Sequence, residues 1–165
     1  NIFFIKKKKL SNKLKNINYI DEFKIKKIYP SSLIVQVKKT NLIGITFINN
    51  KQYYVGENGN FISVNSIKNK DKLPFIFGEF NIQDFLNLKL KLSDSDIIFS
   101  NIKKYHYHKN RRWDLYLNDN VLIQLPNKNI KNAVNLYKKL KTNNEIKPNM
   151  IIDLRIPNRI ILNNG

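Results

Sequence analysis

Apolar and polar residues alternate along much of the chain, and this alternation predicts a largely β-structure. A two-residue period places successive side chains on opposite faces of a strand. It is clearest in four segments, 23–28, 33–37, 112–117 and 121–125. The last two flank Asn118-Asp119-Asn120, so we expect a hairpin there. In its first strand Trp113, Leu115 and Leu117 share one face, and we expect Trp113 to anchor the core.

Further extended segments are expected where apolar runs lie between turn signals. These segments are 41–47, 52–55, 61–64 and 97–107. Asn49-Asn50 and the stretch 57–60 separate the first three, and Gly59 suits the positive φ of a tight turn. The segment 73–78 is different, because proline and glycine punctuate it. We expect it to be an ordered loop packed on the core.

Three segments have the helical period instead. They are 11–20, 81–92 and 129–142, and residues 1–10 before them are expected to be a frayed terminus. Ser11 is a candidate N-cap for the first helix. The third is the strongest, since one apolar stripe faces lysines on the opposite side. The stripe consists of Ile130, Ala133, Val134, Tyr137 and Leu140. Helices combined with antiparallel strands predict an α+β fold.

The C-terminal stretch 148–162 contains two strand-like runs joined at Pro157-Asn158. Two such runs at the end of a chain favour a sheet edge, where unpaired backbone groups can accept a partner strand. We expect 150–155 to belong to the body of the sheet and 159–162 to form the docking edge.

Asp153 and Arg155 fall on the same face of the first of these runs. Two interpretations are open. The two side chains can pair with each other or with neighbouring strands. Alternatively, Arg155 faces outward and meets a carboxylate on a partner, which would set the register of binding.

The composition is that of a globular protein. The 165 residues are 42% hydrophobic and 12% aromatic, which allows a real core. Cysteine is absent, so no disulfide framework or thiolate chemistry is expected. No apolar run approaches the roughly 18 residues of a membrane span. Because the chain begins with Asn1 rather than Met, we expect it to be a fragment, with any anchor or signal upstream.

The formal net charge of +18 raises the possibility of a nucleic-acid or anionic-membrane partner. The predominance of lysine over arginine argues against such a partner. Of the 30 basic residues only Arg111, Arg112, Arg155 and Arg159 are arginines, the residues suited to bidentate phosphate recognition. Lysine, asparagine and isoleucine are enriched together, which indicates a composition bias of the source proteome. No nucleic acid is therefore expected as a partner, although a basic nucleic-acid-binding domain stays an alternative.

No catalytic constellation is recognisable. The chain contains no GxGxxG, P-loop, GxSxG or HExxH motif, and its 12 carboxylates are scattered. His106 and His108 share one strand face, as metal ligands often do, but a third ligand is lacking and three lysines flank them, namely Lys103, Lys104 and Lys109. We expect a structural or surface role for the two histidines, no metal, no cofactor and no enzyme activity.

An ordered set of short motifs resembles a known family. Lys27 to Val37, with Tyr29-Pro30 at its centre, resembles the strand–YP–strand ending of a POTRA domain. Val55 to Phe61 looks like the hairpin that follows it. Four further segments continue the order, Leu73-Pro74 with Gly78, Arg111 to Leu115, Val121 to Pro126, and Ile152 to Arg159. Together they are similar to the bacterial cell-division family FtsQ/DivIB, in its alphaproteobacterial form, over essentially the whole chain.

The resemblance implies a fold and a domain organisation. Residues 1–42 would be the C-terminal portion of a POTRA domain, and residues 43–165 an FtsQ-type β-domain, a mostly antiparallel sheet with flanking helices. It also implies a non-enzymatic divisome scaffold at the division site. This region would lie in the periplasm, held to the inner membrane by a single upstream helix that is not in this sequence.

The resemblance further implies partners and a site. An FtsB-like protein would add a strand to the last strand, an FtsL-like protein would bind through it, and other division proteins could bind through the POTRA portion. Arg155, in the D-x-R motif, would contact an acidic partner residue. Ile156 replaces the aromatic residue that often follows, and Pro157 and Asn158 replace the small residues of the next turn. The implied partner-binding residues are Arg155, Ile156, Asn158, Arg159, Ile160, Ile161 and Leu162.

An alternative from the same structural class stays open. Another POTRA-bearing module, one that receives outer-membrane chains by strand addition, would share the early motifs. The sequence upstream of residue 1 would separate a membrane-anchored protein from a cytosolic one.

Overall fold

The computed structural model describes residues 7–30, 32–93 and 101–164. The elements follow in the order α1 (Lys7–Lys15), β1 (Ile20–Ile28), β2 (Ser32–Lys39), β3 (Leu42–Ile48), β4 (Lys51–Gly56), β5 (Phe61–Ser63), the 3-10 turn η2 (Val64–Ser66), β6 (Phe75–Phe77), α2 (Ile82–Ser93), β7 (Ile102–Tyr107), β8 (Trp113–Leu117), β9 (Leu122–Gln124), α3 (Ile130–Thr142), β10 (Met150–Asp153) and β11 (Ile161–Asn164).

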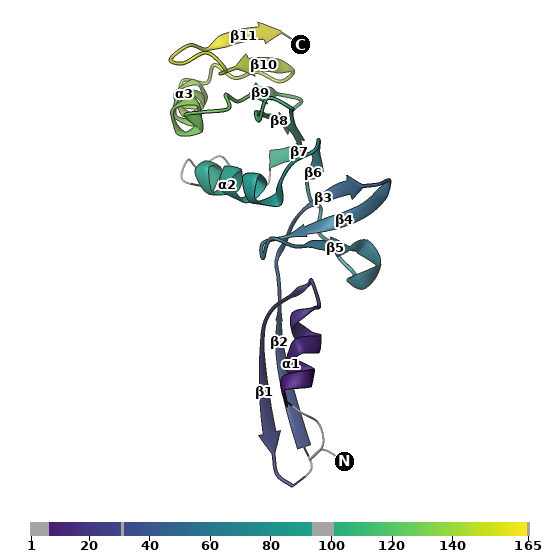
Figure 1. Ribbon diagram of the computed structural model, residues 1–165. Coiled ribbons are helices and arrows are strands. Elements are labelled where there is room, and N and C mark those ends of the chain that lie inside the picture. The colour runs from purple at the N-terminus through teal and green to yellow at the C-terminus, as the bar shows by residue number, and fades with distance from the viewer. Residues whose placement is uncertain (1–6, 31, 94–100, 165) are drawn as a thin grey trace.

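The strands form two sheets. β1 and β2 pair antiparallel on their own, and α1 lies beside them as a projection at the N-terminal end (Figure 1). The other strands form a nine-stranded sheet in the order β11-β10-β9-β8-β7-β6-β3-β4-β5. Figure 1 shows β11 as its outermost strand, at the opposite end of the molecule from α1. The predicted α+β class is confirmed.

Most pairs in the large sheet are antiparallel, and the parallel pairs have a connection long enough to allow them. A parallel pair needs a crossover, usually a helix. α2 connects β6 to its parallel neighbour β7, and α3 connects β9 to its parallel neighbour β10. β3 and β6 are also parallel, with β4, β5 and η2 between them in the chain. The two helices therefore decide where the C-terminal strands join the sheet.

The core lies between the large sheet and these two helices. All five stripe residues predicted for α3 are buried, and Phe85, Leu88 and Leu92 are the buried residues of α2. Trp113 is 3% exposed, and its ring lies among four other aromatic rings, those of Phe80, Phe85, Tyr105 and Tyr107. Its predicted role as a core anchor is confirmed.

The predicted loop at 73–78 is wrong, since Phe75–Phe77 forms β6 in the middle of the sheet. Its strand partners, β3 and β7, lie about thirty residues away on either side, so no local pattern marks it. Pro74 and Gly78 flank the strand rather than interrupt it. Gly78 has a φ of 99°, which a side-chain-bearing residue rarely adopts.

The first helix is also misplaced in the sequence prediction. α1 begins at Lys7, so Ser11 lies inside the helix instead of capping it, and β1 already begins at Ile20. Residues 7–10, expected to fray, belong to this helix, and residues 1–6 lie outside the described residues. Of the strand predicted over 97–107, β7 occupies the second half, and 94–100 lie outside the described residues.

Candidate partner-binding edge

β11 is the terminal strand of the large sheet and pairs on one side only, with β10. The antiparallel register places Asp153 opposite Ile161 and Met150 opposite Asn164. All four residues of β11 are exposed. The sequence prediction of a sheet edge at the C-terminal end is therefore confirmed, whereas its use by a partner stays a prediction.

The exposed strand is shifted by two residues from the predicted 159–162. Pro157 and Asn158 form a turn that Arg159 closes by donating its backbone N–H to the carbonyl oxygen of Ile156 at 3.2 Å. Asn158 has a φ of 58°, within the left-handed region that asparagine tolerates. Arg159 and Ile160 therefore precede the strand, and Asn163 and Asn164 extend it. The apolar run before them ends at Leu162, so no apolar pattern in the sequence marked these asparagines as strand residues.

Arg155 pairs within the chain. Its Nε donates to Oδ1 of Asp153 at 2.7 Å, its Nη2 donates to Oδ2, and its backbone N–H donates to Oδ1 at 3.0 Å. These hydrogen bonds, those of the side chain above all, hold the pKa of Asp153 below its usual range. Of the two interpretations left open by the sequence, the intrachain pair is present. The Arg155 side chain is nevertheless 39% exposed, so its cation is fixed in direction and still accessible.

A second buried carboxylate lies in the same cross-strand row. Asp114 is 3% exposed and pairs in register with Gln124, which in turn pairs with Asp153. Nε2 of His108 lies 2.8 Å from Oδ2 of Asp114. Nε of Arg112 lies 3.9 Å from Oδ1, and both of these atoms are buried without a hydrogen-bond partner. The alternation placed Asp114 away from the Trp113 face but gave no sign of its burial.

His106 belongs to this row, because it pairs in register with Asp114. The rings of His106 and His108 are stacked, with 4.6 Å between their centroids. Desolvation, followed by the neighbouring His108, lowers the pKa of His106. Within residues 7–30, 32–93 and 101–164, no group of three or more His, Cys, Asp or Glu residues is arranged to hold a metal ion.

A groove adjoins the turn before β11. Its volume is about 440 Å³, and it lies between the start of α3 and the 155–158 turn. Ala133 and Leu136 contribute its apolar wall, and Arg155, Ile156 and Asn158 line the opposite side. The structure thus places five of the seven predicted site residues in two groups, with Arg159 and Ile160 between them. Arg155, Ile156 and Asn158 border a groove, and Ile161 and Leu162 lie on the strand edge, each 39% exposed.

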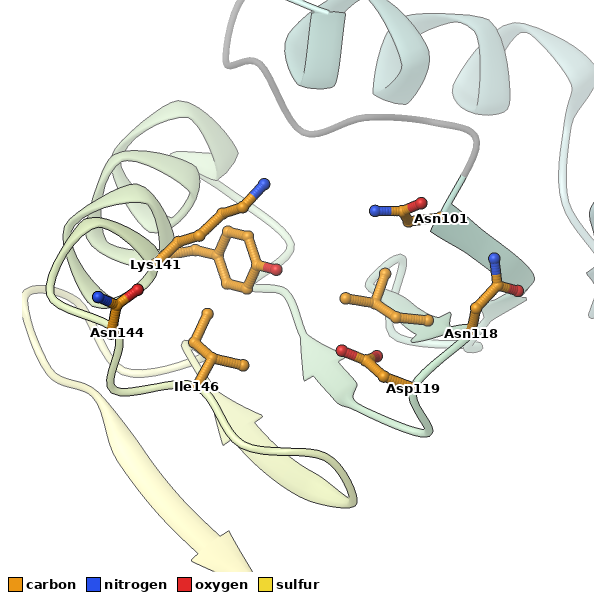
Figure 2. Close-up of a pocket in the computed structure, with 8 residues that line it drawn as sticks. Asn101, Asn118, Asp119, Lys141, Asn144 and Ile146 are labelled. Atoms are coloured by element: carbon orange, nitrogen blue, oxygen red, sulfur yellow. The ribbon is translucent and has the colours of Figure 1, made fainter.

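A hollow of about 390 Å³ lies at the other end of α3, near the β8–β9 turn (Figure 2). Figure 2 shows Lys141 and Asp119 on opposite walls, with Asn101, Asn118 and Asn144 around them. Among its described lining residues are three asparagines, one carboxylate, that of Asp119, and one lysine, Lys141.

The described residues contain no helix whose length and apolar character would let it cross a membrane. The strands β4 to β10 lie in a part of the chain that matches a known family, whereas β11 follows the matched residues. Residues 46–155 match the family model described as cell division protein FtsQ/DivIB, C-terminal. The chain belongs to the FtsQ/DivIB family of cell division proteins.

Curated relatives agree with this family. The FtsQ of Rhizobium radiobacter is 24% identical over 149 residues, which are 89% of this chain and 71% of that protein. The FtsQ of Rickettsia prowazekii is 30% identical over 165 residues, 96% of this chain and 60% of that protein. The FtsQ of Agrobacterium fabrum is 24% identical, and the chain covers 47% of its length. The chain thus spans from about half to under three quarters of these relatives.

Among solved structures, the major extracytoplasmic domain of DivIB from Geobacillus stearothermophilus is similar at a TM-score of 0.45 and 14% identity, covering 67% of this chain and 99% of that one. The family predicted from the motifs is confirmed by the family model and the curated relatives. The boundary between residues 1–42 and 43–165 stays a prediction.

Proposed function

We propose that this chain is a non-enzymatic scaffold of the division machinery, and that β11 receives a strand from an FtsB-like protein. An FtsL-like protein would join through that partner. The observation that carries the proposal is the state of β11, which ends the nine-stranded sheet with four exposed residues and one unpaired side. An open edge of this kind provides a row of backbone donors and acceptors for an added strand.

The opposite edge of the same sheet supports the choice of β11. β5 has only three residues and runs directly into η2. The side-chain amide of Asn18 donates to the backbone carbonyl oxygen of Phe61 at 3.0 Å, so an acceptor of β5 is already occupied. Short, covered edges resist strand addition. β11 is the more open of the two edges.

Arg155 supplies a means of selecting the partner. Asp153 orients its guanidinium, and Nη1 forms no hydrogen bond with any residue in the described part of the chain. A carboxylate on the added segment can approach this cation from solvent. The groove beside it can accept an apolar side chain that precedes the added strand. Backbone pairing would supply affinity, and the cation would set the register.

The location follows from the same proposal. We place this region in the periplasm, with the chain held to the inner membrane by a helix upstream of the sequence. The family match favours cell division over an outer-membrane assembly module or a nucleic-acid-binding domain. Other division proteins could bind through the POTRA-type portion that contains α1, β1 and β2.

The test is the affinity of the chain for the periplasmic part of the FtsB homologue, measured by calorimetry. Arg155→Glu is expected to weaken binding at least about tenfold. Because this change also breaks the pair with Asp153, Asp153→Asn is the matched control. It removes the same ion pair but keeps the cation, so it should retain most of the affinity. No binding by the unmodified chain, or equal affinity for Arg155→Glu, would refute the proposed site.

A further inference from the structure

One face of the nine-stranded sheet has no α-helix over it in the part of the chain that the structure describes. α2 and α3 lie on the same side of the sheet in Figure 1, and the core is between them and the strands. On the other face the register aligns one residue from each of six strands in a row, namely Ile45, Phe75, Lys104, Tyr116, Leu122 and Ile151. A solvated sheet face normally carries polar residues at such positions. Five of these six have aliphatic or aromatic side chains.

The apolar character is greatest where β3 meets β6. The ring centroids of Phe47, Phe75 and Phe77 lie 6.0 to 6.3 Å apart, with nearly parallel planes. Phe47 is 48% exposed and Phe75 is 38% exposed. We call these three rings the phenylalanine ladder. Stacked rings open to water are costly to a monomer and are typical of a contact surface.

A cavity of about 480 Å³ continues the ladder at Phe75. Its apolar lining consists of Phe75 with Ile45, Leu73, Pro74 and Ile102. This volume is enough for one large side chain of a partner, which a flat surface would not hold in place. The ladder and the cavity together provide a broad apolar contact and a defined anchor position.

The rim of this surface is cationic. Lys72 and Lys103 line the cavity, and Nζ of Lys104 lies 3.7 Å from the centroid of the Tyr116 ring. One carboxylate, that of Asp71, lines the cavity with them. None of the three lysines forms an ion pair with a carboxylate in the described ranges. The local excess of positive charge favours a negatively charged occupant.

We propose that the phenylalanine ladder and the adjacent cavity form a second docking surface, for an acidic protein segment that carries an aromatic or large aliphatic anchor. A second copy of this chain is disfavoured, because two chains of formal charge +18 would meet at lysine-rimmed faces. β10, β9 and β8 separate β11 from β7, so this surface and the proposed strand-addition edge can be occupied together. The inference does not depend on the proposed function.

The test uses a displayed library of random peptides a dozen residues long, selected on the chain itself. The expected peptides contain aspartate or glutamate beside an aromatic or large aliphatic residue. Their affinity for the variant Ile161→Pro, which alters β11, should equal their affinity for the unmodified chain. The double variant Phe47→Ser/Phe75→Ser should lose at least about tenfold in affinity. The matched control is Leu90→Ser, which removes a side chain 66% exposed on α2 and should change nothing.

Two further variants test whether binding of the selected peptides depends on the lysines at the rim. The double variant Lys72→Gln/Lys104→Gln should weaken binding of the selected peptides and make their affinity less dependent on salt. The single variant Lys139→Gln on α3 should change neither the affinity nor its salt dependence. Peptides that lack acidic residues, or that bind the double serine variant equally, would overturn the proposal. So would phenylalanine-dependent binding to phosphatidylglycerol vesicles without peptide binding, or self-association that the serine variant abolishes.

Discussion

The guanidinium of Arg155 is bound by the carboxylate of Asp153, two residues earlier, with 2.7 Å between Nε and Oδ1. Asp153 is the last residue of β10 and is 8% exposed, whereas Arg155 lies in the turn that leads to β11. A buried carboxylate at the end of one strand thus fixes the direction of a cation next to the edge strand. This relationship connects the stability of the sheet to the chemistry of the proposed site.

The first prediction concerns pH. Hydrogen bonds from Arg155 lower the pKa of Asp153 in the folded chain below the ordinary carboxyl value of about 4. The stabilisation is therefore complete above the unfolded pKa and is lost as pH falls through the folded pKa. Urea unfolding at neutral and acid pH should show a smaller loss of stability on acidification for Asp153→Asn than for the unmodified chain. Equal losses would contradict a stabilising role of the pair.

The second prediction concerns the backbone of β11. Successive N–H groups of a strand point to opposite sides, so of Ile161 and Leu162 one directs its N–H to β10 and the other directs it to solvent. Proline at the position whose N–H pairs with β10 should lower the free energy of unfolding. Proline at the position whose N–H points to solvent should leave folding intact and abolish binding of the FtsB-like partner. Denaturation and calorimetry on both variants measure this. Two stable variants that bind normally would exclude strand addition at β11.

The third prediction concerns the junction between β2 and β3. Thr40 is 6% exposed, and its Oγ1 accepts a hydrogen bond from the backbone N–H of Asn58 at 3.1 Å. Thr40→Val removes this acceptor at nearly constant volume, with an expected cost of about 1–2 kcal/mol.

The matched control for this prediction is Thr142→Val. The hydroxyl of Thr142 donates to the carbonyl oxygen of Lys138 at the exposed end of α3. Its loss should change stability by less than about 0.5 kcal/mol. Urea denaturation compares the two variants, and equal effects would show that the junction hydrogen bond adds nothing.

The fourth prediction compares two glycines with positive φ. A Cβ at Gly78 would collide with the backbone carbonyl oxygen of Tyr107, whereas a Cβ at Gly59 would meet only Leu86 at 3.8 Å. Gly59→Ala should lower the free energy of unfolding by about 1–2 kcal/mol, which is the strain of the left-handed conformation alone. Gly78→Ala should cost clearly more, because the backbone of β7 must move. Thermal unfolding ranks the two, and the reverse order would be inconsistent with this contact.

The sequence by itself determined the elements with local signals. The stripe from Ile130 to Leu140 predicts α3, and the alternation around Trp113 predicts the β8–β9 hairpin, because each pattern places its apolar side chains on one face. The ordered motifs also led to the family that the family model confirms. Pro157-Asn158 marked the turn before the last strand.

Only the tertiary structure decided the features that depend on distant residues. β6 exists because β3 and β7 pair with Phe75–Phe77 from both sides, and no pattern within three residues predicts that. The burial of Asp114 depends on how neighbouring strands align, because Gln124 and His106 pair with it from two other strands. The phenylalanine ladder forms for the same reason, since strand register places Phe47 beside Phe75 and Phe77 on a face without a helix.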